Sequence, residues 1–207
     1  MATSVEQGRE TRARLMAAAV DLVAEHGWGE VTTRMVADRA GVRPGLVHYH
    51  FASVTDLLID TSVQAARREY ESVMAGVMAL PGPEAMRGML AAIAAYTTID
   101  PTTVVMTEMM LAATRHERLR AELGGLVAEA RTVLARWFRD NSAVADPEAT
   151  AAVVVALLDG LILHRLIDSS LGAVDVTGPL LRAAGLTECR TSEGKSDEQA
   201  GGGGPGR

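Results

Sequence analysis

Apolar residues recur every three or four positions along most of the chain, and this spacing is typical of amphipathic helices. The pattern predicts helices over residues 9–26, 33–40, 44–51, 55–79, 85–97, 101–114, 116–141, 148–171 and 176–184. Turn-forming residues such as Gly27, Gly41 and the PGPE segment at 81–84 separate them. Runs of β-branched residues are short, and aromatic residues make up 3% of the chain. The sequence therefore predicts an all-α protein.

The helical pattern divides the chain into two parts and a tail. The three short helices form a first domain over residues 1–52, and the helices of residues 53–186 form a second domain, a helical bundle. The helix over 55–79 is long enough to connect the two bodies. From residue 187 the composition is polar and ends in GGGGPGR, which predicts a disordered tail over 187–207.

Residues 32–51 form two short helices joined by a tight turn. Thr32 or Thr33 can cap the first helix, because either hydroxyl can accept a hydrogen bond from the opening turn. Gly41 is the residue expected in a left-handed conformation at the end of a helix. Pro44 suits the first turn of the next helix, where its missing N–H costs nothing.

The second of these helices has an outward face suited to DNA. Val47 and Phe51 are four residues apart and can turn inward together. Arg43, Leu46 and His50 then lie on a different face of the helix. A guanidinium, an imidazole and an exposed leucine are suited to contacts in the major groove. The segment is therefore predicted to be a DNA-binding helix-turn-helix.

Residues 31–58, VTTRMVADRAGVRPGLVHYHFASVTDLL, resemble the DNA-binding segment of the TetR-type (tetracycline-repressor) transcriptional regulators. The matching features are the turn at 40–42, Gly45, the aromatic run at 48–51 and the leucines at 57 and 58. The chain departs from the family pattern at His48, where a tyrosine is usual, and at Val54, where a lysine is usual. The resemblance implies a dimer whose two reading helices enter successive major grooves of a palindromic operator.

The same resemblance assigns roles to individual side chains. It implies that Arg34 and Arg43 contact bases or phosphates and that Leu46 touches a thymine methyl group. Other residues of the motif would hold the DNA backbone. The candidate DNA-binding residues are Thr33, Arg34, Arg43, Pro44, Gly45, Leu46, His48, Tyr49, His50 and Ser53.

Methionines are concentrated in the second domain, where the resemblance implies a small-molecule effector. Flexible thioether side chains can line an adaptable apolar cavity, although they can equally fill a core. An effector in such a cavity would be a neutral or weakly polar organic molecule. The candidate effector-binding residues are Met86, Met89, Leu90, Ile93, Met106, Met109, Met110, Trp137, Leu161 and His164.

The predicted helix over 148–171 is apolar nearly all round between Ala151 and Leu163. A helix with no polar face must be covered on both sides, which predicts a second subunit against it. Asp159, His164 and Arg165 within it argue for a buried helix and against a membrane span. The candidate dimerisation residues are Val154, Leu158, Leu161, Ile162, Arg165, Leu180 and Leu181.

Charge and motif content narrow the remaining function classes. A net charge of -6 disfavours a nonspecific DNA-packaging protein, which would be basic over a whole face. The lone cysteine, Cys189, and the lack of an apolar leader in the first twelve residues favour a reducing, cytoplasmic location. No phosphate loop, CxxC or nucleophile elbow occurs, so no cofactor, metal or catalytic site is predicted.

The preferred interpretation is a ligand-responsive repressor that a small apolar molecule releases from its operator. Two alternatives stay open. One is a dimeric DNA-binding protein without an effector, and the other is a helical-bundle enzyme.

Overall fold

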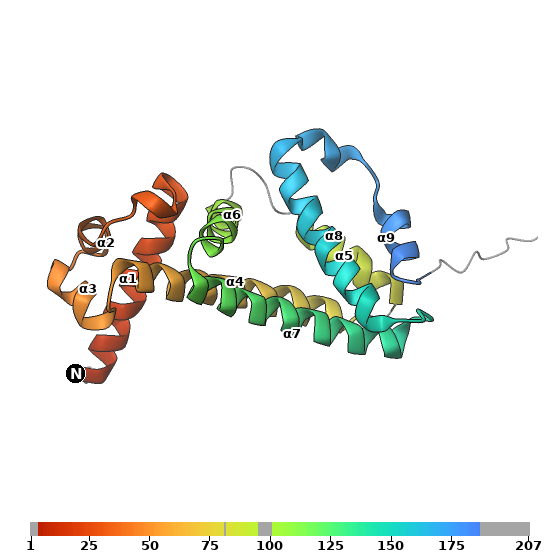
Figure 1. Cartoon of the computed structure of the whole chain (residues 1–207), viewed down its shortest axis with the longest axis horizontal. Coiled ribbons are helices and arrows are strands. Elements are labelled where there is room, and N and C mark those ends of the chain that lie inside the picture. Colours follow the sequence, from red (N-terminus) through yellow and green to blue (C-terminus); the bar gives the residue numbers. More distant parts are fainter. Residues whose placement is uncertain (1–3, 81, 95–100, 187–207) are drawn as a thin grey trace, which may run out of the picture.

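The computed structural model describes residues 4–80, 82–94 and 101–186, and every secondary-structure element in these residues is helical. The molecule is elongated, with a small head at one end and a helical bundle at the other (Figure 1). The prediction of an all-α protein is confirmed. The tail predicted over residues 187–207 lies outside the described residues.

The described residues form nine α-helices, of which the first three and the start of the fourth make up the head. In chain order the helices are α1 (Ser4–His26), α2 (Thr33–Ala40), α3 (Pro44–His50), α4 (Val54–Met78), α5 (Gly82–Ala94), α6 (Pro101–Ala113), α7 (Glu117–Asn141), α8 (Pro147–Ile167) and α9 (Thr177–Ala183). Two short 3-10 turns, η1 (Trp28–Glu30) and η2 (Ser169–Ala173), follow α1 and α8.

The first helix begins earlier than the sequence pattern predicted. It starts at Ser4 and not at residue 9, which corrects the expected boundary by more than one turn. The carboxylate of Glu6 lies in the first turn, where it stabilises the positive end of the helix dipole. The hydroxyl of Thr11 donates to the carbonyl of Gln7 at 2.9 Å and so joins the extension to the part of the helix that the sequence predicted.

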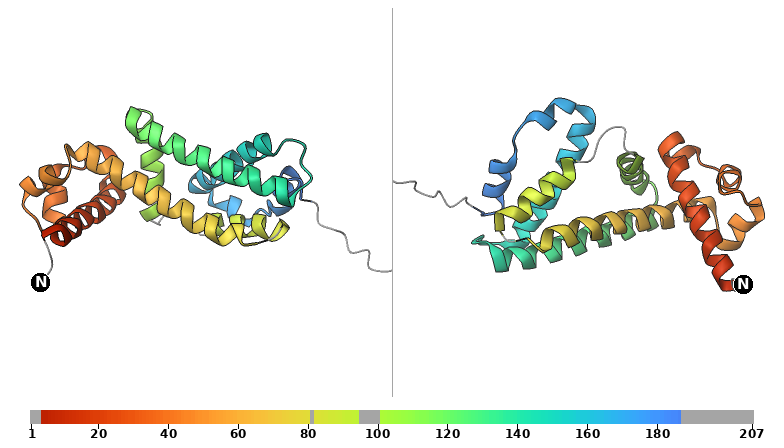
Figure 2. Two further views of the ribbon diagram at one scale, coloured as in Figure 1. Left: turned by 90° about the horizontal axis from the view of Figure 1, so that it is seen from below. Right: turned by 180° about the vertical axis from the view of Figure 1, so that it is seen from behind.

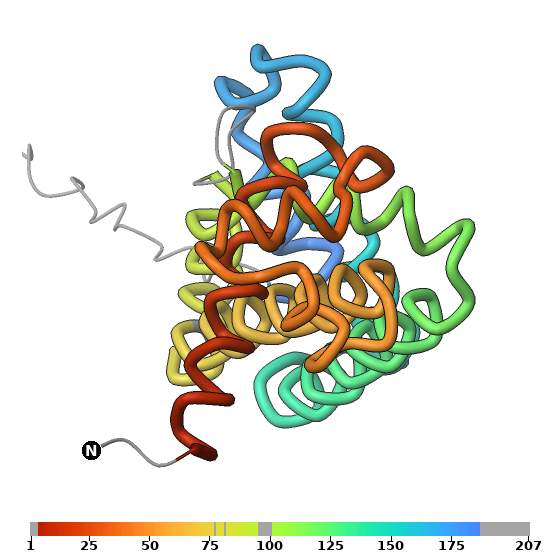
Figure 3. The backbone as a smooth tube through the Cα atoms, turned by 90° about the vertical axis from the view of Figure 1, so that its left-hand side faces the viewer, coloured from red at the N-terminus to blue at the C-terminus, as the bar shows by residue number. Residues whose placement is uncertain are grey.

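The long helix α4 connects the head to the bundle, as the sequence predicted. Ser53 caps it, because its hydroxyl oxygen accepts the N–H of Asp56 at 3.0 Å and its hydroxyl donates to the Asp56 carboxylate at 2.8 Å. Helix α7 runs parallel to α4 along the length of the molecule (Figure 2). An ion pair between Arg67 and Glu129, at 3.4 Å, joins the two helices. Viewed end-on from the side of the head, α7 remains in view beside the head (Figure 3).

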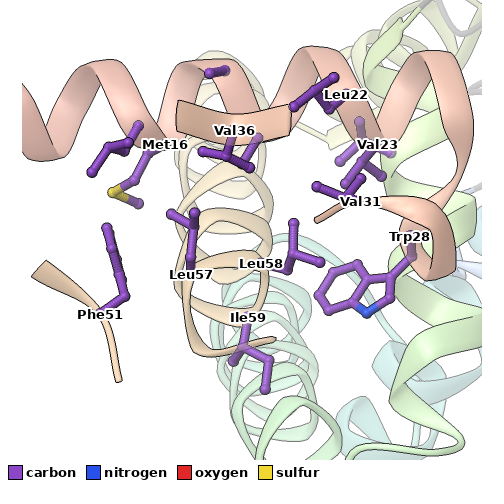
Figure 4. Close-up of a cluster of buried hydrophobic side chains, with 14 of the residues drawn as sticks. Met16, Leu22, Val23, Trp28, Val31, Val36, Phe51, Leu57, Leu58 and Ile59 are labelled. Atoms are coloured by element: carbon purple, nitrogen blue, oxygen red, sulfur yellow. The ribbon is translucent and has the colours of Figure 1, made fainter. Parts of the chain in front are cut away.

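A first core holds the head together and continues beyond it. Leu15, Val36 and Leu57 are fully buried in it. Leu58 lies beside Trp28, on the side of α4 away from Leu57 (Figure 4). The same core includes buried residues of α6 and of the first turns of α7. It therefore crosses the division at residue 53 that the sequence predicted between two domains.

A second core fills the bundle at the far end, where α5, α7, α8 and α9 meet. Phe138 is fully buried there, and its ring meets Trp137 edge-on with centroids 5.4 Å apart. Met86 and Leu180 are also buried in this core.

Helix α8 differs from its prediction in length and in burial. It ends at Ile167 and not at residue 171, because the carboxylate of Asp168 accepts the N–H of Ser170 at 2.9 Å and begins a 3-10 turn. Only 11% of its most apolar stretch is buried. In the single chain α8 packs on α7 with one face and leaves another uncovered, so the predicted cover on both sides is not supplied by the chain itself.

Candidate nucleic-acid interface

Three local features fix the turn between α2 and α3. The hydroxyl of Thr32 accepts the N–H of Met35 at 3.3 Å and caps α2. Gly41 ends α2 with φ at 64°, in the left-handed region that disfavours residues with a Cβ atom. The guanidinium of Arg14, from α1, donates to the carbonyl of Ala40 and holds this end of α2 against α1.

Helix α3 has one buried face and one exposed face. Val47 is fully buried and Phe51 nearly so, as their spacing predicted. The opposite face carries Leu46 and Tyr49, and Tyr49 is 80% exposed although it is a large aromatic residue. The ring of His50 meets the Tyr49 ring edge-on at 5.0 Å between centroids. Two large side chains are therefore exposed on a face of α3 that the head's own core does not cover.

The arginines of the head fall into two groups. Arg12 pairs with Asp60 at 2.8 Å, and Arg14 binds the end of α2. Arg39 forms a bidentate ion pair with Glu25. The hydrogen bonds of this pair hold the pKa of the Glu25 carboxyl below its ordinary value. These three guanidinium groups hold the head together.

Arg34 and Arg43 form the second group and lie at the exposed surface of α2 and α3. The side chain of Arg34 is 87% exposed, and its Nε atom lies 3.7 Å from the carboxylate of Asp38 on the same helix. Arg43 is exposed at the N-terminal end of α3, and its side chain makes no capping bond. These two guanidinium groups are therefore available to a partner.

The predicted DNA-binding residues share one region of the head but differ in exposure. Ser53 is half-buried, and its hydroxyl serves mainly as the cap of α4. The exposed members are Arg34, Arg43, Pro44, Gly45, Leu46, His48 and Tyr49, and the half-buried members are Thr33, His50 and Ser53.

The sequence reasoning missed the first turns of α1 as a neighbour of α3. A Cβ atom added at Gly8 would lie 3.9 Å from Cε1 of His50, so this segment runs beside the exposed helix. The helical pattern does not extend to segment 4–8, because this segment lacks apolar residues at helical spacing. The acidic residue in the first turn was the one signal that could have placed it in the helix.

Besides the shared apolar core, side-chain hydrogen bonds connect α6 and α7 to the head. The carboxylate of Glu108, on α6, accepts the backbone N–H of Trp28 at 2.9 Å, just after α1 ends. Gly27 approaches the same carboxylate, and its φ of 82° disfavours any other residue. The Trp28 ring in turn lies 6.1 Å from the ring of His116, before α7. Glu108 is thus a structural partner of the head.

A second contact is made by Arg118 in the first turn of α7. Its guanidinium donates to Asp56 at 2.9 Å and also to Asp60, both on α4. These hydrogen bonds raise the pKa of Arg118 above its ordinary value. Because Asp60 also binds Arg12 and Asp56 also binds Ser53, this one side chain connects α7 to α1 and to the cap of α4.

The candidate effector residues do not come together in one place. Met86, Met89 and Trp137 are buried in the bundle core, and Leu90 packs on it in part. Met106 and Met109 belong instead to the core of the head, because α6 packs against α1. The remaining candidates are Ile93, which is buried, Leu161, which is half-buried, and Met110 and His164, which are exposed.

The candidate dimerisation residues are also divided. Val154, Leu180 and Leu181 are buried in the chain's own bundle core, since α9 packs on α5 and α8. Leu158 packs on this core in part, and Leu161, Ile162 and Arg165 are half-buried. The uncovered apolar residues of α8 are Val153, Leu163 and Ile167.

In the part of the chain that the structure describes, no group of three or more His, Cys, Asp or Glu side chains is arranged to hold a metal ion. By length and composition alone, α8 would also suit a membrane span, as core helices of other proteins do.

Comparison with known protein families gives two matches along the chain. Residues 15–61 match the model described as "Bacterial regulatory proteins, tetR family". Residues 81–186 match the model described as "Tetracyclin repressor-like, C-terminal domain". Together they cover the head, most of the bundle and the exposed face of α3.

Individual relatives agree with these matches. An uncharacterised HTH-type transcriptional regulator of Mycobacterium bovis is 29% identical over 160 residues, which cover 76% of this chain and 82% of that protein. A TetR-family structure from Streptomyces coelicolor A3 is 28% identical, with a TM-score of 0.69 over 84% of this chain and 98% of that one. The multidrug binding protein EbrR, solved with imidazole, is 29% identical, with a TM-score of 0.64 over 83% and 93%.

Proposed function

The chain belongs to the tetR family of bacterial regulatory proteins, and from this premise we propose that it is a repressor, released from a palindromic operator by a small apolar molecule. The observation that carries the proposal is the exposed face of α3, where Arg43, Leu46 and Tyr49 stand outside the core of the head. A DNA-binding regulator of this kind acts inside the cytoplasm, where its operator lies.

The exposed face of α3 fits the chemistry of the major groove. Arg43 would donate to a guanine edge or a phosphate, and Leu46 would contact a thymine methyl group. Arg34, at the N-terminal end of α2, would bind the backbone and fix the position of the head on the duplex. Because Arg12, Arg14 and Arg39 have partners within the protein, the DNA surface is a small patch, which agrees with a net charge of -6.

Binding to a palindromic site requires two heads, and the uncovered face of α8 supports a homodimer. Val153, Leu163 and Ile167 are exposed apolar residues on this helix, and Ile167 is 88% exposed. A second copy of the chain, related by a two-fold axis, would cover the same face on both subunits. The two copies of α3 would then reach half-sites about 34 Å apart, one turn of DNA.

The effector site is proposed between α5 and α8, where the partly buried Leu90 packs on the core that holds Met86 and Met89. Its apolar lining favours a neutral or weakly polar molecule. The methionines of α6 belong to the core of the head, so they would not contact the effector. An effector would affect them only through a movement of α6. EbrR, a relative that binds imidazole, shows that a chain of this fold accommodates a small organic molecule.

Release of DNA requires that the effector prefer the conformation that does not bind the operator. The bond from Glu108 to the Trp28 N–H and the bonds from Arg118 to Asp56 and Asp60 are the polar contacts that would transmit this preference. Because of these contacts, a movement of α6 would displace the end of α1, and a movement of α7 would displace the start of α4. A tenfold preference for the non-binding conformation is worth about 1.4 kcal/mol per site.

The decisive experiment measures binding to a fluorescent duplex taken from the DNA upstream of the gene. A repressor with an effector binds this duplex, and members of a library of neutral apolar metabolites reverse the binding. A DNA-binding protein without an effector binds but is not released by any compound. A helical-bundle enzyme does not prefer this duplex to a scrambled one, which would contradict the proposal.

A further inference from the structure

A groove separates α1 from α4 on one side of the junction between the head and the long helices, with a volume of about 410 Å³. Its origin is visible in the sequence. Ala13 and Ala17 of α1 face Ala65 of α4, so small side chains stand where two helices would otherwise fill the space between them. Met16 and Val20 complete an apolar floor. The volume lies within the range of small-molecule sites in proteins.

The rim of this groove is positively charged. Arg9, Arg12 and Arg68 line it, and its described lining contains no carboxylate. Arg12 is held in place, since it pairs with Asp60 and lies 4.8 Å above the Phe51 ring. Guanidinium groups around an apolar floor attract an anion that also has an apolar part.

A hydroxyl group in the wall of the groove lacks a hydrogen-bond partner. Thr61 is only 4% exposed, and its Oγ1 atom makes no hydrogen bond within the described part of the chain. A buried hydroxyl without a partner destabilises the folded state, so such groups are rare in native proteins. The neighbouring Gln64 is engaged by Arg68. An acceptor entering the groove could satisfy the Thr61 hydroxyl after a small adjustment of its side chain.

We propose that this groove binds a small amphipathic organic carboxylate, with its charged end at the arginines and its apolar body over the alanines. The site is separate from the effector site proposed between α5 and α8; binding of the carboxylate does not depend on the repressor assignment, whereas its effect on operator affinity rests on the proposed function. A bound carboxylate contacts both helices, of which α1 belongs to the head and α4 continues into the bundle. It therefore changes operator affinity by the ratio of its own affinities for the two conformations of the protein.

The test is calorimetric titration of the full-length protein, without DNA, with octanoate. Two matched compounds separate the parts of the proposal: 1-octanol has the apolar body without the charge, and sulfate has the charge without the body. We expect octanoate to bind with one site per chain and at least tenfold more tightly than either compound. Equal binding of octanol or of sulfate would overturn the assignment of an amphipathic anion.

Two variants locate the site. Ala17→Phe fills the groove from an exposed position of α1, and Arg68→Gln removes a charge from its rim. Each should weaken octanoate binding at least tenfold. Ala121→Phe and Arg136→Gln introduce the same changes at exposed positions of α7 and should leave octanoate binding unchanged. Octanoate binding of normal affinity in Ala17→Phe would show that the site is elsewhere.

A third variant separates a ligand-binding role of Thr61 from a structural one. Thr61→Val keeps the shape of the side chain and removes the hydroxyl without a partner. We expect a higher melting temperature and weaker octanoate binding, and a merely structural hydroxyl would not produce the second effect. If Ala17→Phe and Arg68→Gln weaken operator binding while octanoate fails to bind the parent protein, the groove is a DNA contact and the proposal is wrong.

Discussion

Replacing Arg43 by alanine tests the proposed DNA surface most directly. Arg43 stands before the first residue of α3, is exposed, and makes no capping bond with its side chain. The buried residue nearest in the helix is Val47, which the substitution leaves in place. We therefore expect the Arg43→Ala protein to fold normally and to melt at the temperature of the parent.

The expected loss in DNA binding follows from the number of contacts removed. An arginine that donates to a guanine edge is worth about 1–3 kcal/mol of discrimination. A homodimer on a palindrome loses this contact in both half-sites, so the change amounts to about 2–6 kcal/mol in total. Since 1.4 kcal/mol is a factor of ten, operator affinity should fall at least about 25-fold.

The assay is fluorescence anisotropy with the operator duplex and with a scrambled duplex, each at several salt concentrations. A base contact lowers affinity for the operator and leaves the scrambled duplex nearly unaffected. A phosphate contact lowers both and reduces the salt dependence by about one ion per half-site.

The matched control is Arg39→Ala, which removes a guanidinium group of the same head that is paired with Glu25. This variant should lower the melting temperature slightly and leave operator affinity unchanged. Parental affinity of Arg43→Ala for both duplexes would refute the assignment of α3 as the reading helix. An equal loss of affinity in both variants would show that the arginines act only through net charge.

The remaining predictions concern assembly, coupling, pH and the tail. Leu163→Glu should place a carboxylate on the uncovered side of α8 and give a monomer in sedimentation velocity; a parent protein that is itself monomeric at micromolar concentration would refute the dimer. Arg118→Ala should retain operator binding but respond less to the effector, because it breaks the bonds to α4, whereas Arg120→Ala, two residues along α7, should behave as the parent. Burial raises the pKa of Asp159 above 3.8, so protonation favours the folded state, and the resulting stability is lost as the pH rises through the folded-state pKa. Asp159→Asn should therefore raise the melting temperature at pH 7 and lose this advantage as the medium becomes acidic. Truncation before Glu193 should change neither melting temperature nor operator affinity, and a loss of either would show that the tail has a role.

Much of the head was determined by local sequence. The residues around the turn, Thr32, Gly41 and Pro44, each have a conformational preference that acts within one helical turn, and all three have the predicted role. The spacing of Val47 and Phe51 likewise determined which face of α3 is buried. Helical periodicity also predicted the approximate bounds of the helices in the described residues. This was possible because the periodicity depends only on neighbours three and four residues apart.

The partners of the charged side chains depended on the tertiary structure. Arg39 and Arg43 are four residues apart in sequence and equally polar, yet Arg39 is engaged by Glu25 of α1 and Arg43 is exposed. The packing of α2 against α1, which brings Arg39 to Glu25, decides this difference. The same reason explains Glu108, whose partner Trp28 lies 80 residues away in sequence and which no periodicity could identify.

The core that each methionine joins and the face of α8 that is left uncovered also depended on the tertiary structure. Met89 and Met109 have similar surroundings in sequence, but α5 packs at the far end of the molecule and α6 packs against the head, so the two side chains belong to different cores. The all-round apolar character of α8 could be read from the sequence alone, and it predicted that both sides need a cover. Which face is left uncovered depends on how α7 and α9 pack against α8, and packing between helices distant in the chain is a property of the folded structure alone.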